Sequence, residues 1–138
     1  QLIWGLRGLP EFLVANPGLN SGFMIPQYAA AAMVSQNKQL CSPSSVDSIV
    51  SSRGQEDHVS MAANGATRLL RVSENLNTVV AIEAIVAFQA LDFREVEKAG
   101  KKTKELYAQF RGQIPTLEAD RVLHYDIMKA KKLLKSLI

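Results

Sequence analysis

The chain has 138 residues, of which 47% are hydrophobic, 21% are charged and 7% are aromatic, and its net charge is +3. This composition can build a packed core and excludes an intrinsically disordered chain. Cys41 is the only cysteine, which excludes an intrachain disulfide and a cysteine-rich metal site and is typical of a protein from the reducing cytoplasm.

Residues 1–20 are expected to be irregular, because glycines and prolines interrupt them repeatedly. The segment Asn20-Ser21-Gly22 then offers capping groups for a helix that runs from about Phe23 to about Gln39. Pro26 falls near the first turn of this helix, where a missing N–H costs little. The alanines at 29–32 are small on every face, so the sequence predicts a smooth helix buried in a bundle. The chain also begins at Gln1 and continues at once with apolar residues, so we expect a piece of a longer protein.

A Ser-rich connection follows over 41–54, with a single turn expected around 45–48. Ser52 and Gln55 have the spacing of a capping box, which predicts that the next helix begins there. Apolar residues then recur every three or four positions to Leu91. The longest apolar run, 79–91, is too short to span a bilayer, which needs roughly 20 residues, and Glu83 and Gln89 interrupt it.

This second helix, if unbroken to about residue 94, would be about 60 Å long at 1.5 Å per residue. A domain of this size is only about 30 Å across, so this chain alone cannot bury both ends of such a helix. We therefore expect it to pack against missing parts of its own chain, against sister subunits, or against both.

Two shorter helices are predicted over about 97–111 and 125–137, joined by a connection that contains Pro115. No segment shows convincing strand alternation, so the fold class is all-α. We divide residues 1–138 into an irregular lead-in (1–20), bundle helices (21–95) and basic C-terminal helices (96–138). The lysines of the last part alternate with leucines at helical spacing and no aromatic stacking platform accompanies them, which favours a solvated helix face over a nucleic-acid interface.

The most unusual stretch is Gln55-Glu56-Asp57-His58, which is expected at the start of the long apolar helix. Charged groups are costly there unless they face the helix N-terminus or a ligand. Helix capping is the simpler physical interpretation, and substrate contact is the alternative. A metal site is not indicated, because consecutive side chains fan around a helix and the second histidine, His124, is 66 positions away.

Several ordered motifs closely resemble the C-terminal half of the histidine ammonia-lyases, in the aromatic amino acid ammonia-lyase family. The match is good over residues 5–95 and loose over 96–138. The motifs are the segments 18–25, 29–32, 36–38, 45–48, 80–83 and 89–94, together with Gln55-Glu56-Asp57-His58-Val59-Ser60-Met61.

The resemblance implies a partial domain of a long-helix bundle of the ammonia-lyase and fumarase-like type. It implies a homotetramer whose active sites combine residues of more than one subunit, acting on a small amino acid with no nucleic-acid or membrane partner. It also implies a 4-methylideneimidazole-5-one group, formed from an Ala-Ser-Gly tripeptide, which activates the amino acid so that a β-proton and ammonia can leave. For the histidine enzymes this converts L-histidine to trans-urocanate.

The same resemblance assigns roles to a few side chains. Glu56 matches the glutamate that contacts the substrate in the histidine enzymes, so it is the candidate catalytic and substrate-binding residue. Phenylalanine ammonia-lyases have an amide there, and a carboxylate suits a ring that has N–H donors. Met24 matches a methionine of the substrate pocket. Gln55 and Asp57 are expected to support these substrate contacts by hydrogen bonds. Asn20 and His58 are expected to be structural members of their motifs.

Other family features do not occur in these residues. The chain contains no Ala-Ser-Gly, so it has no cofactor-binding residue of its own, and it has no motif for the family's catalytic tyrosine or carboxylate-binding arginine. Tyr28, Tyr107 and Tyr125 match neither motif. We expect a piece of a lyase that is inactive alone and that joins the missing N-terminal part. The alternatives are a tyrosine ammonia-lyase or aminomutase, or a non-catalytic helical assembly module.

Overall fold

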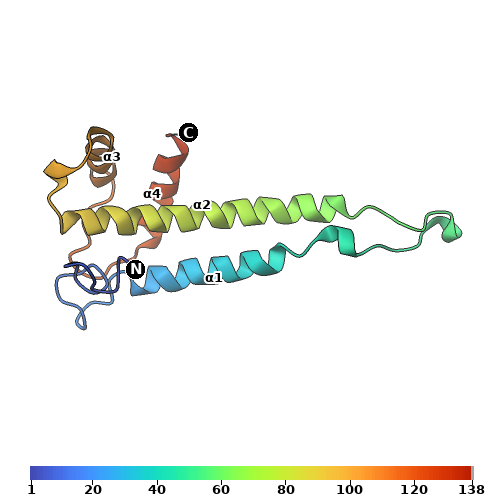
Figure 1. Cartoon of the computed structure of the whole chain (residues 1–138), viewed down its shortest axis with the longest axis horizontal. Coiled ribbons are helices and arrows are strands. Elements are labelled where there is room, and N and C mark those ends of the chain that lie inside the picture. Colours follow the sequence, from blue (N-terminus) through green and yellow to red (C-terminus); the bar gives the residue numbers. More distant parts are fainter. Residues whose placement is uncertain (138) are drawn as a thin grey trace.

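The computed structural model describes residues 1–137, which form an elongated helical structure (Figure 1). Pairing of extended segments in this range is limited to isolated bridges such as Trp4 with Glu11. The all-α prediction is therefore confirmed. The elements in chain order are α1 (Met24–Leu40), the 3-10 turns η1 (Ser44–Val46) and η2 (Ser52–Gly54), α2 (Ala62–Asp92), the 3-10 turn η3 (Val96–Lys98), α3 (Lys101–Arg111) and α4 (His124–Lys135).

Helices α1 and α2 lie side by side and run in opposite directions, so they form a long hairpin (Figure 1). The connection between them, residues 41–61, forms a tip far from both chain termini. The lead-in, α3 and α4 gather at the other end of the hairpin. No helix within residues 1–137 is long and apolar enough to cross a membrane.

The hydrophobic core sits at the end of the hairpin opposite the tip. Only the C-terminal part of α2 is well covered there, so Ile85 is buried while Leu69 and Leu70 are exposed. Although it has no regular structure, the lead-in contributes to this core because its apolar side chains fold back onto α2. The buried cluster comprises Ile3, Leu13, Val14, Phe23, Ala81, Ile85, Ala90, Phe110, Ile114, Leu117, Ala130 and Leu133.

A cluster of amides links the two helices of the hairpin near its middle. Asn75 of α2 is buried, and its Nδ2 donates to Gln36 Oε1 and to Asn37 Oδ1 of α1, both at 2.8 Å. A buried amide is costly unless its hydrogen bonds are made. The contact therefore favours one register of α1 against α2, and so one position for the tip.

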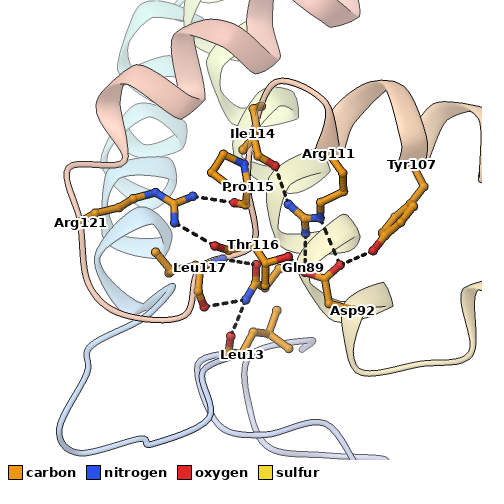
Figure 2. Close-up of polar contacts among 10 residues, drawn as sticks. All are labelled: Leu13, Gln89, Asp92, Tyr107, Arg111, Ile114, Pro115, Thr116, Leu117 and Arg121. Atoms are coloured by element: carbon orange, nitrogen blue, oxygen red, sulfur yellow. Dashed lines mark hydrogen bonds and ion pairs between the residues drawn. The ribbon is translucent and has the colours of Figure 1, made fainter.

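A second polar group holds the C-terminal end of α2 to the following segments (Figure 2). Asp92 accepts hydrogen bonds from Tyr107 Oη at 2.8 Å and from Thr116 Oγ1 at 2.8 Å, and it forms an ion pair with Arg111 at 2.7 Å. Burial and, to a lesser extent, the hydrogen bond to Asp92 raise the pKa of Tyr107 above its ordinary value. Asp92 thus joins α2, α3 and the connection 112–123.

The buried amide of Gln89 joins α2 to the lead-in and to the connection 112–123. Its Nε2 donates to the carbonyl oxygens of Leu13 and Leu117 at 3.0 Å each, and its Oε1 accepts the N–H of Leu117 at 3.0 Å (Figure 2). These bonds explain a polar residue inside the apolar run of α2. They satisfy backbone groups of two irregular segments that would otherwise be buried without partners.

The first helix lies where the sequence predicts it, but the predicted cap does not form. Helix α1 begins at Met24, and no side chain caps it. The N–H groups of Ser21 and Gly22 instead donate to the Asp120 carboxylate, at 2.8 Å each, and Asn20 Oδ1 accepts the N–H of Asp120 at 3.1 Å. A side chain about a hundred positions away therefore holds the turn that leads into α1.

The prediction that the long helix begins near residue 55 is wrong. Helix α2 begins at Ala62 and has 31 residues, which makes it about 46 Å long rather than about 60 Å. The capping box of Ser52 and Gln55 does not form, because Ser52 adopts a left-handed conformation with φ of 54°. The two C-terminal helices also shift slightly, to Lys101–Arg111 and His124–Lys135.

Candidate functional site

The tip between α1 and α2 is a closed hairpin loop. The backbone N–H of Ser51 donates to the Glu56 carbonyl at 3.0 Å, and the N–H of Glu56 donates to the Ser51 carbonyl at 3.3 Å. Nearer the helices, the Ser48 hydroxyl accepts the N–H of Val59 at 2.7 Å and donates to its carbonyl at 2.9 Å. The loop is thus closed at two levels, with Glu56 at the outer one.

The turn that precedes Glu56 is strained. Ser52, Arg53 and Gly54 have φ values of 54°, 60° and 86°, so three successive residues are in the left-handed region. For each of the two non-glycine residues this costs on the order of 1–3 kcal/mol. Such strain persists only where surrounding contacts hold it, and it concentrates in segments that position functional groups.

The four residues of the polar stretch are all exposed in the single chain, and Glu56 points from a loop rather than from a helix. Helix α2 has no acidic residue in its first turn, so the helix-capping interpretation of Gln55-Glu56-Asp57-His58 is wrong. Substrate contact by Gln55 and Glu56 stays a prediction.

Met24, the other predicted substrate-binding residue, lies at the opposite end of the hairpin. It is the first residue of α1, and the 17 residues of that helix extend about 25 Å before the tip begins. The two ends are well separated in Figure 1. The chain therefore does not bring Met24 and Glu56 together, and a single amino acid cannot contact both in one subunit.

The largest cleft lies elsewhere, between the start of α1, the middle of α2 and residues 117–128. It has a volume of about 620 Å³ and a mainly apolar lining that includes Ile25, Ile82 and Ile127. Neither Met24, Gln55 nor Glu56 lines it. Since its lining consists mostly of hydrocarbon, this cleft is suited to packing rather than to acid–base chemistry.

Two charged side chains at the rim of this cleft, Asp120 and Arg121, have internal partners. Two backbone N–H groups, from Ser21 and Gly22, donate to Asp120 and lower the pKa of its carboxyl below the ordinary value of 3.8. Arg121 forms an ion pair with Asp126 at 2.9 Å and donates to backbone carbonyls of the connection 112–123. These groups hold the fold together at the cleft.

Within residues 1–137, no three side chains of His, Cys, Asp or Glu lie close enough to share a metal ion. Cys41 is exposed and free. The structural role of Ser48 was missed at the sequence level. The only indication in the sequence was that Ser48 belongs to the motif 45–48, and no role was predicted for its hydroxyl.

The comparisons with known proteins bear directly on these residues. The family model described as aromatic amino acid lyase matches residues 2–112. The chain belongs to the aromatic amino acid lyase family. This match includes Met24, the whole tip and all of α2. The predicted substrate-binding residues therefore lie inside the region that the family model matches.

Individual relatives agree with this assignment. The chain is 50% identical to the histidine ammonia-lyase of Treponema denticola over 129 residues, which is 94% of this chain and 25% of that protein. It superimposes on the crystal structure of histidine ammonia-lyase from Trypanosoma cruzi with a TM-score of 0.91 and 43% identity, covering 98% of this chain and 27% of that one. It superimposes on the crystal structure of the tyrosine aminomutase from Streptomyces globisporus with a TM-score of 0.86 and 37% identity, covering 94% of this chain and 25% of that one.

These relatives are much longer than this chain. The chain spans about a quarter of the length of the curated histidine ammonia-lyases that it matches. The described hairpin therefore corresponds to one part of a larger family fold, which agrees with a long helix whose N-terminal half has little cover in the single chain.

Proposed function

We propose that this chain is the C-terminal part of a histidine ammonia-lyase, and that the whole enzyme eliminates ammonia from L-histidine to give trans-urocanate. The observation that supports this most is identity of 50% to histidine ammonia-lyases across nearly the whole chain. The chain's own contribution would be to bind and orient the amino acid. The whole enzyme would act in the cytoplasm as a homotetramer and would take part in the breakdown of histidine.

Glu56 would supply the main polar contact. Its carboxylate accepts hydrogen bonds, so it can bind an imidazole N–H or an ammonium group of histidine, and hydrogen bonds to a charged group are stronger than neutral ones. The strained turn presents this carboxylate at the outer end of the hairpin. Gln55 and Asp57 would support it, and Met24 would form an apolar wall of a pocket.

Because Met24 and Glu56 lie at opposite ends of α1, such a pocket needs at least two subunits. The electrophilic group typical of the family is not formed by these residues, since the chain contains no Ala-Ser-Gly. It would come from the remainder of the protein. The roles proposed here are therefore limited to binding, orientation and protection of the substrate from water.

The test uses the full-length protein that contains this chain, with urocanate formation followed by its absorbance. Glu56→Gln keeps the size of the side chain and removes its charge. We expect kcat/KM for histidine to fall by about 10- to 100-fold, because a charge-assisted hydrogen bond contributes roughly 1.5–3 kcal/mol. Glu118→Gln, at an exposed position of the connection 112–123, is the matched control and should equal the parent. Equal activity of Glu56→Gln and the parent would disprove the role of Glu56.

A second candidate is a tyrosine ammonia-lyase or aminomutase. It is favoured by the similarity to the Streptomyces globisporus tyrosine aminomutase. Turnover of histidine and of tyrosine by the same full-length protein separates the two. A non-catalytic assembly module, whose basic helices bind an acidic partner, would instead show turnover of neither and an association that weakens strongly with salt.

A further inference from the structure

Ser48 makes an unusual pair of hydrogen bonds at the neck of the tip. Its hydroxyl oxygen accepts the N–H of Val59 at 2.7 Å, and its hydroxyl hydrogen is donated to the carbonyl of the same residue at 2.9 Å. One hydroxyl thus satisfies both backbone groups of a residue on the opposite arm. The contact joins the segment that leaves η1 to the segment that leads into α2.

Only a hydroxyl side chain fits this role closely. Serine and threonine can donate and accept at one atom, whereas alanine can do neither and a thiol does both weakly. The Ser48 side chain is half-buried, so the backbone groups of Val59 that it serves have limited access to water. Loss of the hydroxyl would leave two partly buried polar groups without partners, which is more costly than losing an exposed hydrogen bond.

Arg68 donates to the Ser44 hydroxyl at the base of the tip, but residues 49–57 have few other contacts that hold them. Ile49 and Val50 are 59% and 67% exposed, so no apolar core lies under the loop. Beyond Ser48, the arms are joined by the two backbone hydrogen bonds between Ser51 and Glu56. These few polar contacts must maintain two strained left-handed residues, Ser52 and Arg53.

From this geometry we propose that Ser48 is a positioning residue, which holds the 51–56 turn in its strained form and thereby sets the place of Gln55 and Glu56 for the substrate. The inference rests on the proposed function for its catalytic part. Its structural part, that the hydroxyl keeps the tip closed, is independent of any reaction.

The structural part is tested by hydrogen exchange on the full-length protein. Ser48→Ala should increase amide exchange in peptides that cover 49–59 by about tenfold, because two hydrogen bonds of roughly 0.5–1.5 kcal/mol each are lost. Ser48→Thr keeps the hydroxyl and should remain close to the parent. Ser45→Ala, at an exposed serine of η1, is the matched control. Unchanged exchange in Ser48→Ala would overturn the inference, whatever substrate the enzyme uses.

The catalytic part is tested by a double-mutant cycle with Glu56→Gln. Ser48→Ala should lower kcat/KM for histidine by about tenfold in the parent, with Ser48→Thr largely restoring it, and by less than twofold when Glu56 is already glutamine. An equal loss in both backgrounds means that Ser48 does not act through Glu56 and overturns the positioning role. If Ser48→Ala does not fold, Ser48→Cys should give an intermediate loss, and the same comparison is made with it. A parent inactive on histidine refutes the proposed function and leaves exchange as the deciding measurement.

Discussion

At the scale of single residues, Asp120 shows how a distant carboxylate can hold the turn that leads into a helix. Its two oxygens accept the N–H groups of Ser21 and Gly22 at 2.8 Å each, directly before α1. Gly22 has φ of 54°, and an added Cβ would lie 2.5 Å from the carbonyl oxygen of Phe12. A glycine is therefore required at this turn.

Asp120 also gives a pH dependence. Because these hydrogen bonds lower its pKa in the folded chain, its contribution to stability is complete above the ordinary value of 3.8 and is lost as the pH falls through the lowered pKa. The thermal midpoint of the full-length protein should therefore decrease less steeply between pH 5 and pH 3 for Asp120→Asn than for the parent. At pH 7 the variant should be the less stable of the two. Parallel curves would contradict this role.

At the scale of elements, the C-terminal end of α2 organises the segments that follow it. Asp92 binds side chains from α3 and from the connection 112–123, while Gln89 binds the backbone of the lead-in and of the same connection (Figure 2). Two polar residues one turn apart thus fix three irregular or short segments against one helix. The helix itself is held by the apolar core around Ile85.

This arrangement predicts unequal effects of two substitutions. Asp92→Ala leaves the Arg111 side chain, only 13% exposed, without its counter-ion, so the free energy of unfolding should fall by about 3–5 kcal/mol. Tyr107→Phe removes one of the hydrogen bonds to Asp92 and should cost about 1 kcal/mol. Denaturant unfolding of the full-length protein measures both. Similar losses for the two variants would show that the ion pair is not the main contact.

At the scale of the whole molecule, the antiparallel hairpin separates two predicted substrate contacts. Helix α1 places Met24 at one end and the tip with Glu56 at the other, so one subunit cannot offer both to one substrate. Exposed apolar residues along the hairpin, including Leu69, Leu70 and Leu76, agree with a chain that packs against other surfaces.

Mixed oligomers test this arrangement. Met24→Arg and Glu56→Gln should each reduce histidine turnover by the full-length enzyme, because each damages every site of its own oligomer. When the two variants are unfolded and refolded together, some sites should combine an intact Met24 from one subunit with an intact Glu56 from another. Activity should then rise above that of either variant refolded alone. No recovery, in mixtures shown by size to be assembled, would contradict a site that combines Met24 of one subunit with Glu56 of another.

The amino-acid sequence by itself determined the all-α class, the two long helices and the family, because apolar periodicity and motif order are local properties of the chain. It also singled out Glu56. The tertiary structure decided where α2 begins, since the Ser48–Val59 contact and the left-handed turn at 52–54 keep Gln55-Glu56-Asp57-His58 out of the helix. It tied the turn before α1 to Asp120, about a hundred positions away, and it separated Met24 from Glu56 because the whole length of α1 lies between them. Contacts between distant residues leave no periodic pattern in the sequence, so only the folded chain could reveal them.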